Sequence, residues 1–223
     1  MLSAGERIQP PRNNAAAITG ALNPSSASML GLAAHTAPTQ HIWVVTGPAG
    51  CGKSTVGKGI HLDLGIPFLE GDDFHTKSNK EKMSSGTPLT DADRWDWLIS
   101  LRQAAIDALS PSESNNFHPP AGVVVACSAL KRKYRDVMRV AAYGAPNVQI
   151  HFVYLRLDEE ALFRRVTQRQ AHYMKSSMVQ SQLKDLEEPK GEWDAMTVDA
   201  DVAPELVKEE VERLVRGKLA EFE

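Results

Sequence analysis

The sequence predicts an α/β fold, a parallel β-sheet sandwiched by helices, on the basis of two observations. From His41 onward, short apolar runs of strand length alternate with longer segments of helical periodicity. These runs are apolar throughout rather than at every second residue, which indicates strands buried on both faces. Ligands of such sheets bind at the carboxyl ends of the strands, so a site is expected in the segments that follow them.

The predicted strands begin at residues 42–45, and a glycine-rich turn leads from there into a helix that runs to about Leu64. Four further strands are expected where short apolar runs recur, at residues 66–69, 123–126, 150–155 and 196–198. The serine- and proline-rich stretch 110–120 is expected to be a surface loop between ordered elements.

Two of the predicted helices carry clear start signals. Thr90 is placed to cap a helix that has Asp93 in its first turn. The apolar face of this helix is formed by Trp97, Leu101, Ala104, Ala105 and Ala108. A last helix is expected from about Pro204, with an apolar face formed by Val207, Val211, Leu214 and Val215.

Composition limits the classes of function. The chain has 223 residues, 42% hydrophobic and 24% charged, which suits one soluble domain with a sizeable core. The net charge is −3 and no apolar run approaches the roughly 20 residues of a membrane helix, so neither nucleic acid nor membrane is expected as a partner. Cys51 and Cys127 are too few for a disulfide framework or a zinc site, so a reducing compartment, the cytoplasm, is expected.

The first forty residues differ from the rest. Their only charges are Glu6, Arg7 and Arg12, and they are rich in Ala, Ser, Pro and Asn without sustained periodicity. We expect residues 1–40 to be a disordered N-terminal extension and residues 41–223 to form the folded domain. A transit peptide is the alternative, although two arginines in forty residues support it weakly.

The strongest motif lies between the first strand and the first helix. Residues 47–54, GPAGCGKS, match the phosphate loop G-x-x-x-x-G-K-[ST] in the strand–turn–helix context that it requires. Its glycines let successive N–H groups surround an anion, and the helix N-terminus adds its positive end. Lys53 is expected to reach the β- and γ-phosphates of ATP, and Ser54 to ligate Mg²⁺. The predicted nucleotide-binding residues are Gly47, Pro48, Ala49, Gly50, Cys51, Gly52, Lys53, Ser54 and Thr55; a redox role for Cys51 is the less favoured alternative.

Polar residues follow the second and third predicted strands. The second is followed by Glu70, Asp72, Asp73 and His75, and the third by the basic stretch 131–135, KRKYR. Acids can orient a hydroxyl or hold Mg²⁺, and cations can hold a carboxylate or a phosphate. A solvated turn and a wet helix face are the alternatives, but the neighbouring phosphate loop favours the functional interpretation.

Individual roles follow from position. Asp72 is interpreted as the group that receives the acceptor hydroxyl's proton, with His75 as a rival base. Glu70, two residues before Asp72, would face the same side of a continuing strand, which suits it to Mg²⁺ or its water. Arg165 and Arg169 are four residues apart and so share a helix face, from which both could reach the transferring phosphate; ion pairs on a wet helix are the alternative.

Four separated blocks resemble the gluconokinase family, in the family's order and within about residues 41–198. They are residues 68–75 (FLEGDDFH), 82–98 (KMSSGTPLTDADRWDWL), 127–135 (CSALKRKYR) and 165–187, with Arg165, Arg169, His172, Met174, Ser181, Gln182, Leu186 and Glu187. The first forty residues and the 110–120 loop depart from the family but lie outside these blocks. Gln170-Ala171 stands where members often have a glycine, which bears on the flexibility of the family's lid.

The resemblance implies a P-loop kinase of the nucleoside monophosphate kinase-like type with a helical lid at about residues 165–190. It implies transfer of the γ-phosphoryl group of ATP to the 6-hydroxyl of D-gluconate, giving the 6-phosphogluconate that feeds the pentose phosphate pathway, and it implies a homodimer. Gluconate's carboxylate needs a cation, for which Arg94, Lys131 and Arg135 are the candidates. Its hydroxyls need polar partners such as His75 and Gln182.

Two other functions stay open. A kinase for shikimate, adenylyl sulfate or a nucleoside monophosphate would share the fold and the loop, but it should lack the Asp91-x-Asp93-Arg94-x-x-Trp97 block that is present here. A non-catalytic nucleotide-binding module should have lost Lys53, Ser54 or the acidic cluster, and all of these are present.

Overall fold

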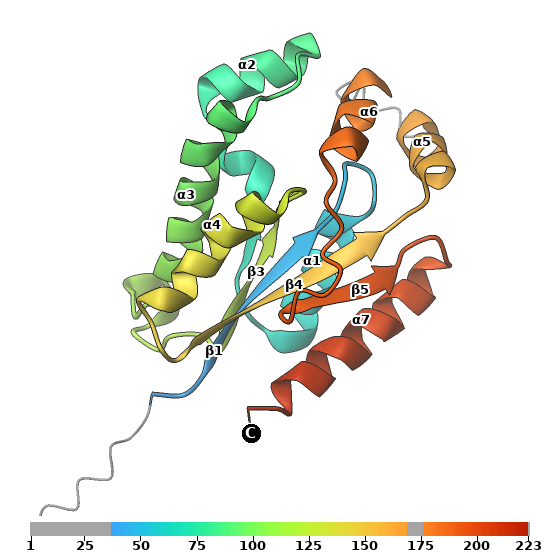
Figure 1. The fold of residues 1–223 in the computed structure, drawn as a ribbon. Coiled ribbons are helices and arrows are strands. Elements are labelled where there is room, and N and C mark those ends of the chain that lie inside the picture. The colour runs from blue at the N-terminus through green and yellow to red at the C-terminus, as the bar shows by residue number, and fades with distance from the viewer. Residues whose placement is uncertain (1–36, 169–175, 223) are drawn as a thin grey trace, which may run out of the picture. The chain divides into compact units, whose positions relative to one another are not determined.

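A five-stranded sheet lies at the centre of the described chain (Figure 1). The structure is a computed structural model that describes residues 37–168 and 176–222. The strands pair in parallel in the order β2-β3-β1-β4-β5. Their bounds are Gln40–Thr46 (β1), Phe68–Glu70 (β2), Gly122–Ala126 (β3), Val148–Arg156 (β4) and Ala195–Asp199 (β5). The predicted parallel sheet is confirmed.

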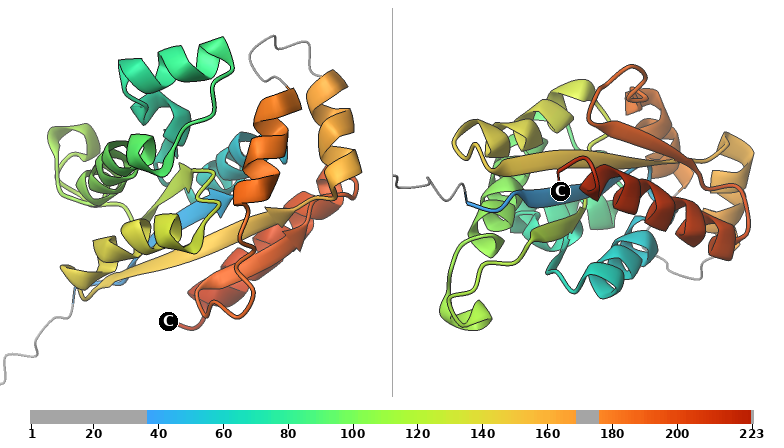
Figure 2. Two further views of the ribbon diagram at one scale, coloured as in Figure 1. Left: turned by 45° about the horizontal axis from the view of Figure 1, so that its top comes forward. Right: turned by 90° about the horizontal axis from the view of Figure 1, so that it is seen from below.

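Helices cover both faces of this sheet (Figure 2). They are α1 (Lys53–Leu64), α2 (Lys77–Ser85), α3 (Asp91–Ala108), α4 (Arg132–Tyr143), α5 (Glu159–Gln168), α6 (Ser176–Asp185) and α7 (Pro204–Leu219). On one face, Ile42 and Val44 of β1 pack in a core with α3 and α4. On the other face, Trp43 and Val45 pack in a second core with α1 and α7. Because alternate residues of β1 enter different cores, the strand is apolar throughout.

Local sequence signals set several boundaries. Thr90 caps α3 in a capping box, in which the Thr90 hydroxyl accepts from the Asp93 N–H and the Asp93 carboxylate accepts from the Thr90 N–H. Pro204 is the first residue of α7, where its missing N–H has no helical partner to lose. The second strand was expected from residue 66 but begins at Phe68, because Pro67 has no N–H to offer the ladder.

The remaining expectations concern segments outside the sheet. The predicted loop at 110–120 joins α3 to β3 and contains one short 3₁₀ helix, η2 (Glu113–Asn115). The proposed N-terminal extension falls almost entirely outside the described residues. Within the described ranges, no helix is both long and apolar enough to cross a membrane.

Candidate active site

The phosphate loop, residues 47–54, joins the carboxyl end of β1 to the first turn of α1. Its backbone has φ values of +141° at Gly47 and +89° at Gly50, a region that other residues rarely adopt. A Cβ added at Gly47 would lie 2.8 Å from the sulfur of Cys51 and 3.0 Å from the carbonyl oxygen of Leu155. The path of the loop therefore requires glycine, and it ends at a helix N-terminus, where free N–H groups attract anions.

Two hydrogen bonds that involve side chains engage polar groups of the loop. The Ala49 N–H donates to Oε1 of Gln182, on α6, at 2.7 Å. The Lys53 ammonium donates to the Pro48 carbonyl at 3.0 Å. The Cys51 side chain is buried, and burial raises the pKa of its thiol. Ser54, by contrast, is half-buried in the first turn of α1.

A pocket of about 70 Å³ opens beside the loop. Its walls come from the phosphate loop, from the turn after β2, from α3, from the segment after β3 and from α6. Six predicted site residues line it together: Ala49, Lys53, Asp72, His75, Arg94 and Gln182. The structure therefore brings the nucleotide loop and most of the predicted acceptor groups to one cavity, whose other lining residues include Trp97, Ser128 and Ser181.

Trp97 supports the turn that carries Asp72 and His75. Residues Gly71–Phe74 form a 3₁₀ helix, η1, and the indole Nε1 of Trp97 donates to the Gly71 carbonyl at 2.7 Å. His75 is buried, and its Nδ1 has no partner among the described residues. Its Nε2 lies 3.9 Å from Oδ1 of Asp72, whose side chain is 77% exposed. Burial lowers the pKa of His75 to about 4, so the ring is neutral at pH 7.

Glu70 and Asp72 are not related as alternate residues of one strand. β2 ends at Glu70 and η1 begins at Gly71, so the strand-alternation argument for the two carboxylates is wrong. They still lie at one edge of the sheet. Burial raises the pKa of the Cys127 thiol, just after β3, to about 12.

Arg94 is the only one of the three predicted acceptor cations that lines the pocket. Its NH1 donates to the Tyr134 hydroxyl at 3.1 Å and lies 3.3 Å from Oδ2 of Asp185. No acceptor among the described residues pairs with its Nε or NH2. One edge of the guanidinium therefore remains available for a ligand.

Lys131 is held outside this pocket. It is the residue before the first turn of α4, and its ammonium lies 3.0 Å from Oδ1 of Asp91 and 2.9 Å from Oδ1 of Asp185. Asp185 thus bridges Lys131 and Arg94, and it was not among the site residues predicted from the sequence. The signal available for it was its position, three residues after Gln182 on the same helix.

Arg135 is bound within the protein, and the prediction that it is a candidate for binding the acceptor's carboxylate is corrected. Its side chain is 2% exposed, and its Nε and NH2 form a two-pronged pair with Glu192 at 2.9 and 2.5 Å. Its NH1 donates to the carbonyls of Ala129 and Leu130. Burial favours a raised pKa for Glu192, but hydrogen bonds from Arg135 and Arg139 outweigh it and lower that pKa to about 2. The guanidinium is therefore fully occupied.

The two lid arginines are only partly described. Arg165 lies in the last turn of α5 and donates to the Ala200 carbonyl at 2.6 Å, so it does not line the pocket. Arg169 lies outside the described residues, as does the middle of the lid predicted at about 165–190.

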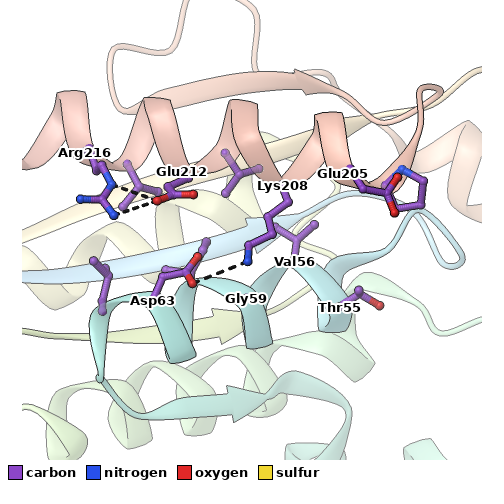
Figure 3. Close-up of a pocket in the computed structure, with 13 residues that line it drawn as sticks. Thr55, Val56, Gly59, Asp63, Glu205, Lys208, Glu212 and Arg216 are labelled. Atoms are coloured by element: carbon purple, nitrogen blue, oxygen red, sulfur yellow. Dashed lines mark hydrogen bonds and ion pairs between the residues drawn. The ribbon is translucent and has the colours of Figure 1, made fainter.

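A second hollow, of about 260 Å³, lies between α1 and α7 (Figure 3). Its walls include Val56, Ile60, Val211 and Val215. An ion pair between Lys208 of α7 and Asp63 of α1 joins the two helices, whereas Arg216 and Glu212 pair within α7. Of the predicted site residues it contains Thr55 alone. This groove is therefore separate from the pocket that joins the phosphate loop to the acidic and basic groups.

Comparisons with known proteins agree with this geometry. Residues 42–189 match the AAA domain family. The chain is 43% identical over 174 residues to the probable gluconokinase of Schizosaccharomyces pombe, covering 78% of this chain and 86% of that protein. It is 37% identical to the thermoresistant gluconokinase of Escherichia coli, covering 80% and 95%. The crystal structure of a gluconokinase from Sinorhizobium meliloti has a TM-score of 0.68 and 37% identity, covering 84% of this chain and all of that one.

The fold and the phosphate loop define a kinase of the P-loop class. Within that class, the chain belongs to the gluconokinase family.

Proposed function

We propose that the protein transfers the γ-phosphoryl group of ATP to the 6-hydroxyl of D-gluconate, giving 6-phospho-D-gluconate. The observation that carries the proposal is the single pocket that unites the phosphate loop, through Lys53, with Asp72, His75 and Arg94. Phosphoryl transfer depends mostly on positioning and on neutralising charge. A pocket in which a phosphate-binding lysine faces a carboxylate, an imidazole and a guanidinium meets both requirements for a hydroxylated acid.

Asp72 is our candidate for the group that orients the acceptor hydroxyl. It lines the pocket with Lys53, and its exposed carboxylate lies at the carboxyl edge of the sheet. A loose transition state needs little deprotonation before attack, so a carboxylate that accepts the hydroxyl's hydrogen bond is sufficient. His75, buried and neutral with an unpartnered Nδ1, is suited to hydrogen-bond an acceptor hydroxyl instead.

Arg94 is our candidate for the cation that binds gluconate's carboxylate. Its Nε and NH2 form the pair of donors that matches a carboxylate, and neither is used by a described residue. Lys131 and Arg135 are less suited, because two aspartates hold the first and Glu192 holds the second. Gln182, also at the pocket, would bond a hydroxyl of the acceptor.

Mg²⁺ fits the residues that the motif nominates. The described residues contain no cluster of three or more metal-ligating side chains. A hydroxyl from Ser54 and one carboxylate from Glu70 suit Mg²⁺, which keeps several waters and is completed by substrate phosphates rather than by a protein cage. When bound, the ion would neutralise charge on the phosphates. Arg165 and Arg169 are proposed to add positive charge at the transferring group, and residues 165–190 are proposed as the lid.

Turnover with purified protein tests the proposal. With Mg-ATP, gluconate should exceed glucose, shikimate and AMP by at least about 10²-fold in kcat/KM, because buried polar groups shaped for one ligand reject analogues that leave them unpaired. The product should be identified by mass and by the position of the phosphate. Equal efficiency with shikimate or AMP would refute gluconate as the substrate.

Three further properties are proposed with this function. A variant lacking residues 1–37 should retain turnover, since we place the catalytic domain at 41–223. A homodimer is proposed and is testable by light scattering. The cytoplasm is proposed as the compartment; in support, Cys51 and Cys127 are both free and buried.

A further inference from the structure

Helix α6 contacts both halves of the active site through two residues one turn apart. Gln182 accepts the N–H of Ala49 in the phosphate loop at 2.7 Å. Asp185 lies 3.3 Å from Arg94 and 2.9 Å from Lys131. Residues three apart share a helix face, and α6 is also held by the buried Val179 and by Leu183, which packs against the core.

In each contact, an oxygen of the protein accepts from, or pairs with, a protein group that we propose binds a substrate. Loop amides of this motif bind phosphate oxygens, and the carbonyl oxygen of Gln182 occupies one such amide. The carboxylate of Asp185 pairs with Arg94, to which the proposed function assigns the carboxylate of gluconate. The pocket that both contacts border has a volume of about 70 Å³.

We propose that α6 is an internal competitor for both substrates, with Gln182 in place of a phosphate oxygen and Asp185 in place of the acceptor's carboxylate. ATP displaces the first contact and gluconate weakens the second. The two ligands then bind cooperatively, because the contacts belong to one helix and releasing either loosens the other. This inference rests on the proposed function for the identity of the acceptor.

The end of α6 supplies a fixed point for such a movement. Just after it, the Glu187 N–H donates to the Leu130 carbonyl at 2.9 Å, and the Glu187 carboxylate accepts from the Arg132 N–H at 2.7 Å. These bonds connect the helix to the start of α4 without using Gln182 or Asp185. Once released from Ala49, the Gln182 amide is free to bond the acceptor's hydroxyl, as proposed above.

A purely structural role of Gln182 and Asp185 predicts the opposite change in ligand affinity. If Gln182 and Asp185 only hold α6 in place for binding, their removal should weaken both ligands. If they compete, their removal should tighten the ligands, because less of the ligand-free protein is in the blocked state. Affinity measured on the stable, full-length protein therefore separates the two roles.

The experiment is calorimetric titration with ADP and with a non-hydrolysable ATP analogue, each with and without gluconate. In the wild type, gluconate should tighten the analogue at least about fivefold, the lower range of allosteric coupling. Gln182→Ala should tighten the analogue by about two- to tenfold without gluconate, the equivalent of one hydrogen bond. Asp185→Asn should tighten gluconate alone, and the double variant should reduce the coupling below about twofold.

Lys184→Ala is the matched control, since Lys184 is exposed on α6 between the two residues; it should behave as wild type. Nucleotide binding by Gln182→Ala that is unchanged or weaker would overturn the inference. Turnover of gluconate by the wild type separates failure of this inference from failure of the proposed function. If the wild type phosphorylates gluconate but Gln182→Ala does not tighten nucleotide, the inference alone fails. If gluconate is not phosphorylated, the proposed function fails, and the acceptor-free affinity of Gln182→Ala still decides the inference.

Discussion

The imidazole of His75 lies face to face with the indole of Trp97, with ring centroids 4.2 Å apart and an interplanar angle of 19°. The same indole donates to the Gly71 carbonyl, so one side chain supports both ends of the turn that carries Asp72. Burial lowers the pKa of His75 to about 4. At neutral pH, His75 therefore offers a hydrogen bond, while Asp72 beside it offers a carboxylate.

The first prediction separates these two residues. Asp72→Asn should lower turnover by roughly 10²–10⁴-fold, the range for a positioned acid–base group, with ATP affinity and Tm near wild type. His75→Ala should mainly raise KM for gluconate, by about tenfold, because it removes one hydrogen bond and leaves space in the pocket. Steady-state kinetics at saturating ATP measure both. An active Asp72→Asn with a dead His75→Ala at saturating gluconate would instead make His75 the base.

Lys53 should act mainly in the transition state. Its ammonium is held at the Pro48 carbonyl, beside the pocket, and is free to turn toward phosphate oxygens that gain charge during transfer. Lys53→Ala should therefore lower turnover by roughly 10²–10³-fold without loss of folding. Lys58→Ala is the control, since Lys58 is exposed on the same helix. Wild-type turnover in Lys53→Ala would show that the loop does not bind the phosphates of ATP.

The sheet and the phosphate loop were predictable from sequence because local patterns determine them. Apolar runs mark β1, β3 and β4, and the glycines at 47 and 50 are required by the loop's own backbone. The partner of Arg135 was not predictable in this way. Arg135 meets Glu192, 57 residues later, and no local pattern connects the two. The sequence therefore predicted three candidate cations for the acceptor's carboxylate, and only one of the three, Arg94, lines the pocket.

The prediction that Glu70 and Asp72 face the same side failed for a related reason. Alternation was applied across Glu70 and Asp72, but the chain turns at Gly71, where a Cβ would lie 2.3 Å from the Ala126 carbonyl oxygen. A glycine needed for close approach of two backbones looks, in sequence, like any other glycine. Tertiary packing, rather than local preference, ended the strand.

Two glycines of α1 should respond to alanine in opposite ways. Gly59 lines the groove between α1 and α7, and an added Cβ would meet nothing within 4 Å (Figure 3). Gly59→Ala should therefore stabilise the protein by about 0.4–1 kcal/mol, by reducing the freedom of the unfolded chain. At Gly57 the Cβ would lie 2.7 Å from the Phe68 ring, so Gly57→Ala should destabilise by about 1–3 kcal/mol. Denaturant unfolding measures both; equal effects would contradict the packing described here.

The buried pair His41 and His151 should make stability fall in acid. Nδ1 of His41 lies 2.9 Å from Nε2 of His151, and burial lowers the pKa of His151 to about 3. The unfolded chain, with a histidine pKa near 6.5, then binds a proton that the folded chain excludes. Stability should therefore be full above about pH 6.5 and fall toward about pH 3, by at most about 1.4 kcal/mol per pH unit for each histidine.

Unfolding free energies between about pH 5 and pH 8 test this dependence. Burial also lowers the pKa of His75, so His151→Phe removes one of three such histidines and should reduce the slope without abolishing it, whatever its effect on absolute stability. His118→Ala removes an exposed histidine from the loop before β3 and is the control for the slope. An unchanged slope in His151→Phe would contradict the assignment of the acid sensitivity to this pair.

Arg94 and Arg135 should separate recognition of the acceptor from stability of the fold. Arg94 lines the pocket with a guanidinium edge that no described residue occupies, so Arg94→Ala should lower kcat/KM for gluconate by roughly 10- to 10²-fold, the equivalent of one charged hydrogen-bonding partner. Glucose has no carboxylate to lose, so its slow turnover should change little and the preference for gluconate should shrink. Arg135→Gln instead removes one of the two arginines that pair with the buried Glu192, which should cost at most about 3–5 kcal/mol of stability.

The kinetic contrast decides which cation recognises the acid. Below its lowered Tm, Arg135→Gln should keep the wild-type KM for gluconate, because its guanidinium is 2% exposed and already bound at both edges. Glu192→Gln should behave like Arg135→Gln, since it breaks the same pair from the other side. Arg94→Ala should lower Tm less than Arg135→Gln, because the Asp185 carboxylate that it leaves still pairs with Lys131. If Arg135→Gln raised KM for gluconate but not for glucose, while Arg94→Ala left the preference intact, the carboxylate would have to be assigned to Arg135.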